Sequence, residues 1–362
     1  MEHPLAAYGW SDRVAALFAA AADGAPGAVP GRVTRADRGS VLVATPSGPV
    51  RADPFGTTAR RAGLDTVPVT GDWLAVTAGD GGDAADTAVV AVLPRWSTIS
   101  RKDPDERVTA EQVLAANVDV LAVVCALDRP VGANRLERML VAAWDSGATP
   151  VVVLAKSDLA PDAGGAVAEA EAAANGVTVL LTSTATGEGV EDVRALLGTT
   201  STLALVGPSG AGKSSLVNRL VGGEVLATSA VRGGDGKGRH TTTARHLVPV
   251  PGGGVLLDTP GLRSLPLWDA QAGVAAAFDD VESLTAGCRF SDCRHEREPG
   301  CAVREAVEAG ALDARRLASW AKLRRELESL ERRQDEQARR ADGRRMGRIV
   351  KQVYELKGRR DR

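Results

Sequence analysis

The sequence predicts a multidomain α/β protein with a small β-barrel, a central and mostly parallel sheet flanked by helices, and a helical domain built around a cluster of metal-ligand residues. Short strand-like runs between turns, longer apolar runs ending in polar or glycine-rich loops, and a Cys/His cluster before a helical pattern support the three parts. The expected boundaries are 1–29 for an N-terminal extension, 30–96 for the barrel, 97–111 for a linker, 112–274 for the central domain, 275–340 for the helical domain and 341–362 for a basic tail.

Composition is that of an ordinary globular protein, with a formal net charge of −2 and 44% hydrophobic residues. No apolar run reaches the roughly twenty residues of a membrane span. Glu2 and Asp12 flank an alanine-rich stretch where a signal peptide would be basic. We therefore expect a cytoplasmic protein without membrane contact, and since nothing in the sequence demands a dimer, a monomer.

The barrel is predicted from short strands between turns, at Gly31–Thr34, Ser40–Ala44, Asp72–Thr77 and Thr87–Leu93. A five-stranded, OB-like barrel of the oligonucleotide-binding type fits best, although the pattern alone does not separate it from other small barrels. Six arginines give this region basic character without an aromatic stacking platform, which favours contacts with RNA phosphates. They are Arg32, Arg35, Arg38, Arg51, Arg60 and Arg61. Residues 95–107 are interpreted as a polar connector.

Residues 207–214 (GPSGAGKS) match the phosphate-loop (P-loop) pattern G-x-x-x-x-G-K-[ST], and they lie between the apolar run Leu203–Val206 and an expected helix at Ser215–Leu220. Glycines let backbone N–H groups surround phosphates, Lys213 reaches their oxygens, and Ser214 can ligate Mg²⁺. A chance glycine-rich turn is the alternative, but it would lack this context. The candidate nucleotide-binding residues here are Gly207, Pro208, Ser209, Gly210, Ala211, Gly212, Lys213, Ser214 and Ser215.

A second phosphate motif, Asp258-Thr259-Pro260-Gly261, ends the apolar run Val255–Leu257. In P-loop enzymes the aspartate supports Mg²⁺, usually through water, and the glycine brings a backbone N–H near the γ-phosphate. Between the two motifs lies 233–243 (GGDGKGRHTTT), from which Thr242 could complete the magnesium shell. A surface loop with incidental threonines is the alternative interpretation.

Hydrolysis requires an oriented water molecule. Ras-like enzymes place a glutamine directly after D-x-x-G, but Leu262 stands here, so intrinsic turnover should be slow. His240 is the nearest candidate to position the water, and a loop histidine that contacts nucleic acid or solvent is an equal alternative. The candidate catalytic residues are Lys213, Thr242, Gly261 and His240.

A guanine-recognition motif of the N-K-x-D type lies upstream of the P-loop, not downstream. The apolar run Thr149–Leu154 ends in Ala155-Lys156-Ser157-Asp158, and the next run, Val177–Leu181, ends in Thr182-Ser183-Thr184. Asp158 would accept the N1–H and N2–H₂ edge of guanine and the Lys156 stem would lie over the base, whereas Ala155 removes one base contact. The alternative is an ordinary loop in which Asp158 caps a helix. The candidate base-binding residues are Lys156, Ser157, Asp158 and Ser183.

Cys288, Cys293, His295 and Cys301 have the spacing C-x4-C-x-H-x5-C. Three thiolates and one imidazole make a closed tetrahedral set for a structural Zn²⁺, with no position left for a reacting water. A disulfide or redox pair is the alternative, which a chain without a secretory signal does not favour. Cys125 lies in an apolar run and is expected in the core.

After this cluster the sequence turns helical and basic. Leu317, Trp320, Leu323, Leu327 and Leu330 recur at three- and four-residue steps and form one apolar helix face. Residues 311–362 hold 17 Lys/Arg and 9 Asp/Glu, or 17 − 9 = +8, so residues 1–310 carry −2 − 8 = −10. Such asymmetry suggests a polyanionic partner, with a solvated helix and tail as the alternative. Beside an OB-like barrel, RNA is favoured.

The motifs occur in the order base recognition, P-loop, switch segment, D-x-x-G, which is the usual GTPase order cut and rejoined. This arrangement resembles the circularly permuted P-loop GTPases, and among them the ribosome small-subunit-dependent GTPase A family. The preceding β domain, the stretch 238–243 (GRHTTT) and the Cys/His cluster extend the resemblance from about residue 30 to residue 340. Ala155 departs from the family's usual asparagine.

The resemblance implies an OB-type barrel and hydrolysis of GTP to GDP with Mg²⁺, by a late maturation factor of the small ribosomal subunit. It further implies contact with ribosomal RNA, turnover stimulated by the subunit, and release after hydrolysis. Two other functions stay open: a nucleotide-gated RNA-binding protein with incidental hydrolysis, which Leu262 allows, and a P-loop ATPase, which Ala155 allows.

Overall fold

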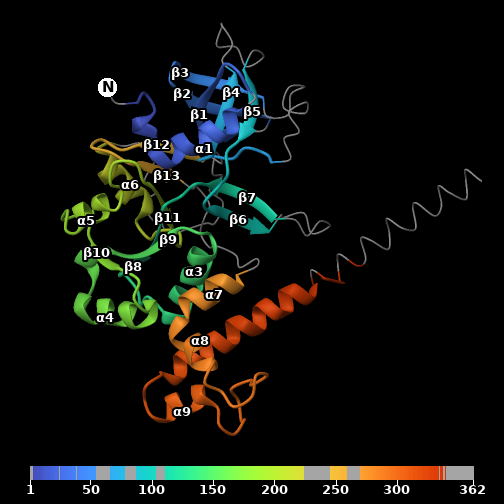
Figure 1. Cartoon of the computed structure of the whole chain (residues 1–362). Helices are drawn as coiled ribbons and strands as arrows, with labels where there is room; N and C mark the ends of the chain where they lie inside the picture. Colours follow the sequence, from blue (N-terminus) through green and yellow to red (C-terminus); the bar gives the residue numbers. More distant parts are fainter. Residues whose placement is uncertain are drawn as a thin grey trace, which may run out of the picture.

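The computed structural model describes residues 3–23, 25–37, 39–53, 66–77, 87–102, 111–223, 245–258 and 270–333, together with 335, 336 and 339. Several predictions concern residues outside these ranges: those for Arg38, Arg60, Arg61, His240, Thr242, Gly261 and the tail 341–362. Figure 1 shows a barrel at one end, a sheet with helices in the middle, and a helical domain at the other end.

The N-terminal barrel has five strands in the order β3-β2-β1-β4-β5, and a parallel bridge between Asp53 and Ala88 joins the end of β3 to the start of β5. Alternate strand residues, such as Val33, Val43 and Leu74, fill its interior. This arrangement confirms the OB-like prediction. The strands are β1 (Ala28–Asp37), β2 (Ser40–Thr45), β3 (Gly48–Ala52), β4 (Trp73–Thr77) and β5 (Ala88–Val92).

The residues expected as a separate extension pack onto this barrel. After η1 (Ala6–Tyr8), the hydroxyl of Ser11 caps α1 (Asp12–Ala22) by accepting the N–H of Val14. Leu5 and Val14 are buried with Trp73 and Leu93 in one apolar cluster. The alanine-rich stretch is therefore a helix that covers one side of the barrel.

The segment predicted as a polar connector contains structure of its own. Strand β6 (Thr98–Lys102) pairs antiparallel with β7 (Glu111–Ala116) in a separate two-stranded ribbon. Ile99 and Leu114 are buried in the core of the central domain, which anchors the ribbon there. The many polar residues of this segment predicted a linker, and they obscured the alternation of buried and outward-facing residues that is typical of a strand.

The central sheet has the strand order β10-β9-β8-β11-β13-β12, in which the first five strands are parallel and β12 is antiparallel to β13. Because β11 follows β10 in the chain but lies between β8 and β13, the sheet has the permuted connectivity predicted. Its strands are β8 (Val120–Ala126), β9 (Thr149–Ala155), β10 (Val179–Thr182), β11 (Thr202–Val206), β12 (His246–Pro249) and β13 (Val255–Asp258).

Helices cover both faces of this sheet. Along β8, Leu121 and Val123 pack towards α3 and α4, whereas Ala122 and Val124 pack towards α5 and α6. Cys125 is buried on the α3 face, where burial raises its pKa to about 11, so the core prediction is confirmed. These helices are α3 (Ala133–Asp145), α4 (Ala163–Ala174), α5 (Val190–Ala195) and α6 (Lys213–Val221).

The barrel is joined to the central domain by pairing of β1 with β12 and by Arg32 of β1. Arg32 is only 1% exposed, and its guanidinium donates to the Thr202 hydroxyl (2.7 Å) and to the carbonyl oxygens of Asn117 (3.3 Å) and Tyr8. The expectation that Arg32 contributes to a basic RNA-facing surface is wrong, because its side chain is consumed in this interface.

The helical domain consists of α7 (Gln271–Ala277), α8 (Asp279–Thr285), α9 (Ala302–Glu308) and a helix over residues 314–333. Helix α7 packs on α3 and crosses the boundary expected after residue 274 (Figure 1). Trp320, Leu323 and Leu327 are buried against the core, with Leu317 and Leu330 partly buried beside them, which confirms the predicted apolar face.

The helix over 314–333 is also fixed by ionic contacts. Arg316 is 4% exposed and donates to the carboxylates of Asp280 in α8 and Glu137 in α3 (3.4 Å to the latter). Glu137 accepts from the Ser319 hydroxyl as well (2.6 Å). Across the described residues, no helix is both long and apolar enough to span a bilayer.

Candidate functional site

The P-loop motif lies at the carboxyl end of β11 and runs into α6, as predicted. Gly207 and Gly212 have φ values of 147° and 95°, which disfavour any residue with a Cβ. A Cβ on Gly207 would also lie only 2.3 Å from the Val124 carbonyl oxygen of β8. The two glycines therefore permit a loop that turns tightly against the neighbouring strand.

Lys213 begins α6, and its ammonium group turns back over the loop. Its Nζ donates to the carbonyl oxygens of Gly207 (2.7 Å) and Pro208 (2.8 Å). Ser214 and Ser215 follow in the first turn, where no acidic residue opposes the positive end of the helix dipole. The first turn of α6 thus carries backbone N–H groups, the ammonium and two hydroxyl-bearing residues, a set of donors suited to phosphate groups.

The base-recognition motif lies at the carboxyl ends of β9 and β10, two strands away from the P-loop along the same edge. Asp158 lies in η2 (Ser157–Leu159) and is exposed. The buried Ser183, just after β10, donates its hydroxyl to Asp158 Oδ1 at 2.5 Å, and the same Ser183 Oγ accepts the N–H groups of Ala185 and Thr186. Ser183 therefore orients the carboxylate with its side chain.

Lys156 is held by a residue that sequence reasoning missed. Its backbone is left-handed, with φ of 64°, and its Nζ lies 2.6 Å from Oδ2 of Asp128, just beyond the end of β8. Hydrogen bonds from Arg129 and Lys156 lower the pKa of Asp128 to about 2. The sequence did offer a signal for this contact, because Asp128 directly follows the apolar run that forms β8. Neighbouring parallel strands end at the same edge of a sheet, so residues that follow β8 and β9 lie close together.

The two halves of the motif set meet although they are distant in the chain. A Cβ placed on Gly212 would lie 3.7 Å from the Cβ of Ala155. Ala155 and Ala211 also belong to the same buried cluster. The small side chain of Ala155 thus lies against the start of α6.

The remaining nucleotide-site predictions concern Asp258 and three residues that follow the P-loop in the sequence. Asp258 ends β13, the strand beside β11, and its backbone pairs with that of His246. The motif aspartate is therefore at the same sheet edge as the P-loop. His240, Thr242 and Gly261 lie outside the described residues.

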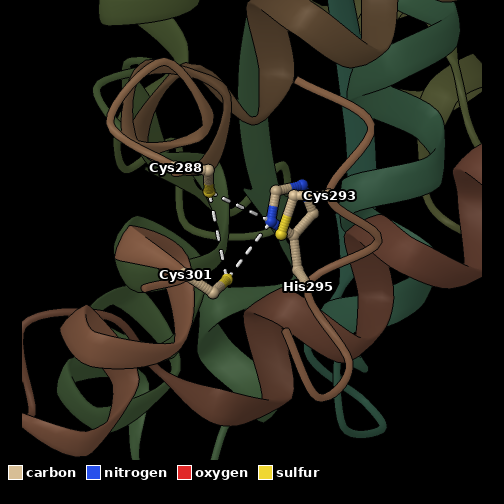
Figure 2. A group of neighbouring side chains, drawn as sticks. All are labelled: Cys288, Cys293, His295 and Cys301. Carbon is tan, nitrogen blue, oxygen red and sulfur yellow. Dashed lines mark hydrogen bonds between the residues drawn. The ribbon is translucent and has the colours of Figure 1, made fainter. Parts of the chain in front are cut away.

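The Cys/His residues come together as predicted. Figure 2 shows Cys288, Cys293, His295 and Cys301 pointing towards one another. Their four potential ligand atoms all lie within 4.8 Å of one another. Cys288 Sγ lies 3.9 Å from Cys301 Sγ, and His295 Nδ1 lies 3.5 Å and 3.4 Å from these two sulfurs. A tetrahedral zinc with bonds of about 2.3 Å to sulfur and 2.0–2.1 Å to nitrogen has edges of about 3.8 Å and 3.6 Å. The donor set fits that ion.

The local fold favours this cluster over a disulfide. All four cysteines are free thiols. Burial acts to raise the pKa of Cys288, but hydrogen bonds from the backbone N–H groups of Val303 and Ala302, at the start of α9, and contacts with the Cys301 and Cys293 thiols together lower it. His295 has a left-handed φ of 60°, and its ring packs edge-on against Trp320 at 5.4 Å. The helix over 314–333 therefore helps to orient the histidine.

Comparisons with known proteins agree with this architecture. A family model described as RsgA GTPase matches residues 92–268. The chain is 46% identical to a small ribosomal subunit biogenesis GTPase RsgA from Streptomyces avermitilis, over 98% of this chain and 95% of the relative. A protein of the same name from Syntrophotalea carbinolica is 42% identical over 83% of this chain and 84% of its own length.

Solved structures give the same fold. YjeQ from Thermotoga maritima matches with a TM-score of 0.62 and 26% identity, covering 83% of this chain and 98% of YjeQ. A second structure, titled as YloQ, a circularly permuted GTPase, matches with a TM-score of 0.59 and 22% identity over 83% of this chain and 96% of its own, a likeness of fold alone.

Proposed function

We propose that this chain, which belongs to the RsgA GTPase family, hydrolyses GTP to GDP and phosphate as an assembly factor of the small ribosomal subunit. The observation that carries the proposal is the meeting of base-recognition and phosphate motifs at one sheet edge, with Gly212 beside Ala155. Such a site suits one nucleotide lying across the ends of β9, β8 and β11.

The residues divide the work by chemistry. Lys213 and the first-turn N–H groups of α6 neutralise phosphate charge, and Ser214 is the candidate protein ligand for Mg²⁺. Asp258 supports the metal, and Thr242 completes its shell. Bound Mg²⁺ supplies charge neutralisation on the phosphate oxygens. Gly261 senses the γ-phosphate, and His240 is the candidate for orienting water where Leu262 cannot.

Guanine selection falls to Asp158, with Lys156 against the base and Ser157 and Ser183 beside it. The hydrogen bond from the Ser183 hydroxyl to Asp158 Oδ1 supports this assignment, because it fixes the orientation of the carboxylate. Ala155 lacks the amide that an asparagine would offer, so this carboxylate carries most of the discrimination. The base specificity should accordingly depend on one side chain.

Zinc is proposed as the ion of the Cys/His cluster, in a structural role. Four ligands fill a tetrahedral shell, so no position remains for substrate. The proposed partner is the small ribosomal subunit with its RNA, which the barrel and the basic residues 311–362 would contact. The protein would act as a cytoplasmic monomer and would leave the subunit after hydrolysis.

GTP hydrolysis with and without small ribosomal subunits tests the proposal, with ATP and large subunits as controls. Slow basal turnover should rise steeply only with GTP and small subunits. Turnover indifferent to subunits would contradict the assembly role and favour an RNA-binding protein with incidental hydrolysis. Equal hydrolysis of ATP would favour the P-loop ATPase instead.

Asp158→Asn tests base recognition separately. The variant should lose GTP and gain xanthosine triphosphate, because an amide donates where xanthine offers a carbonyl. Asp128→Asn is the companion variant: it should weaken GTP binding moderately without changing the preferred base, since it releases Lys156 and leaves Asp158 in place. A GTP preference that survives Asp158→Asn would contradict the assignment.

A further inference from the structure

The segment between the first two cysteines of the metal cluster presents an aromatic ring to solvent. Phe290 is 42% exposed, and among the described residues the other large hydrophobic side chains this exposed are Val67 and Leu159. The guanidinium carbon of Arg289 lies 5.6 Å from the Phe290 ring centroid. A flat ring and a planar cation are thus presented together.

This pair is held in position by its surroundings. The Arg289 N–H donates to the Gly300 carbonyl (3.0 Å), and a Cβ on Gly300 would lie 3.1 Å from Arg289 Cβ, so the arginine stem rests against that glycine. The Cys293 N–H donates to the Phe290 carbonyl (3.3 Å), closing a turn between two metal ligands. Both side chains therefore project from a braced segment.

The charges of the same loop favour an anionic partner with a flat face. Glu298 is occupied inside the loop, where its carboxylate accepts backbone N–H groups of residues 294, 296 and 297 at 2.9–3.1 Å. No ion pair among the described residues engages the exposed guanidinium groups of Arg294 and Arg297. Exposed Asp292 and Glu296 offset part of this charge, so charge alone does not make the site.

We propose that Arg289 and Phe290 form a stacking platform for an unpaired nucleobase of RNA, with Arg294 and Arg297 meeting its flanking phosphates. The inference rests on the proposed function and names the form of RNA that this end of the protein contacts. An unpaired base offers a free π-face for stacking on an aromatic ring, whereas bases inside a duplex are already stacked. A protein partner would fill an apolar pocket with Phe290 but has no need of the three guanidinium groups.

Binding of the full-length, zinc-loaded protein to small ribosomal subunits separates these readings. Phe290→Ala should weaken binding about 5- to 150-fold, the range for loss of one stacked base. Phe290→Trp should retain binding, and Phe290→Leu should lose nearly as much as alanine because it keeps apolar volume but no ring.

A fluorescence titration of Phe290→Trp identifies the ligand. Its added tryptophan emission, measured as the difference from wild type, should be quenched by a single-stranded oligoribonucleotide and much less by the same sequence in a duplex. Quenching by intact subunits but by neither RNA would indicate a protein contact and overturn the proposal. So would wild-type affinity in Phe290→Ala or Phe290→Leu.

Zinc content and subunit-independent GTP hydrolysis should be unchanged in every variant, since Phe290 is exposed and lies outside both sites. If wild-type protein failed to bind small subunits at all, the proposed function would fail. If wild type bound and Phe290→Ala bound equally well, only the stacking platform would fail.

Discussion

The central domain is fastened to its two neighbours by buried arginines that meet different acceptors. Arg32, on the barrel side, donates only to neutral oxygens, those of Thr202, Asn117 and Tyr8. Arg316, on the helical side, donates to the carboxylates of Glu137 and Asp280. Without a carboxylate partner, burial lowers the pKa of Arg32 to about 10, an effect that nearby Asp119 and Asp72 only partly offset.

The difference shows how each interface tolerates loss of its arginine. Removing Arg32 leaves carbonyl and hydroxyl groups short of a donor, and it also removes a buried cation. Removing Arg316 leaves Glu137, which is 1% exposed, with Arg315 (3.1 Å) and Ser319 as its partners, and it also takes the guanidinium away from Asp280. The interface on the helical side should therefore be more sensitive to substitution, because taking a cation from two carboxylates costs more than leaving a neutral hydrogen bond unmade.

Metal removal should have the largest effect, and only on the helical side. Structural zinc supplies about 10–16 kcal/mol of folding free energy in small zinc domains. Chelation should expose α9 and the loop 288–301 to hydrogen exchange while the barrel strand β2 stays protected. Equal loss of protection in β2 would mean that the two ends of the molecule are not independent.

Arg316→Met should come next, with about 3–5 kcal/mol lost from the opening free energy of the helix over 314–333. Hydrogen exchange of that helix measures the loss. Arg325→Met is the matched control, because Arg325 is exposed on the same helix and its Nε donates only to the Ala321 carbonyl.

A charge-matched double variant sharpens this point. Adding Glu137→Gln to Arg316→Met should recover part of the loss, since the buried acceptor would then be neutral. If the double variant were no more stable than Arg316→Met alone, the loss would come from the broken contact with Asp280 or from packing against Phe278, over whose ring Arg316 lies at 4.6 Å.

Arg32→Met should cost about 1–3 kcal/mol, the range for unsatisfied buried polar groups. Protection of β1 against hydrogen exchange is the measurement, and Arg35→Met, on the same strand but 40% exposed and paired with Asp37, is the control. A loss larger than that of Arg316→Met would reverse the ranking and break the comparison.

The smallest expected effect concerns pH. The hydrogen bond from Arg138 lowers the pKa of Glu326 on the helical side, so its stabilisation is complete above the ordinary glutamate pKa and is lost as pH falls through the folded-state value. Glu326→Gln should lower the free energy of unfolding at pH 7 by no more than about 1 kcal/mol, because the pair is half exposed. The measurement is a slight drop in the melting temperature. The gap to wild type should close on acidification.

Asp72 on the barrel side should behave in the opposite way. Burial raises its pKa despite the Arg95 partner, so its contribution is present at acid pH and falls as pH rises above the ordinary aspartate pKa. The stability of wild type relative to Asp72→Asn, measured as the difference in melting temperature, should therefore increase as pH falls. Parallel pH profiles for the two variants would contradict the assignment of burial as the deciding cause.

Local patterns were predictable from sequence, and contacts between distant segments were not. The P-loop, the apolar face around Trp320 and the Cys/His cluster each depend on residues within a stretch of fourteen positions, so spacing alone indicated them. The permuted connectivity was also predictable, because the order of the motifs along the chain indicated it, whereas the order of the strands in the sheet came from the structure.

Arg32 illustrates what sequence could not separate. It is one of six arginines in the barrel region, and nothing near it in the chain distinguishes it from Arg51, which is exposed. Its burial depends on Thr202 and Asn117, which lie 170 and 85 residues away. The same holds for Asp128, whose contact with Lys156 depends on β8 lying beside β9.

The insertion of β11 between β8 and β13 has a consequence for synthesis on the ribosome. Strands β8, β9 and β10 emerge first, and residues 127–201 must be translated before β11 can cover the second edge of β8. At about 5–20 residues per second this takes roughly 4–15 s. During that interval the nascent chain presents an apolar, unpaired strand edge and has no P-loop, so bound nucleotide cannot protect that edge from misassembly.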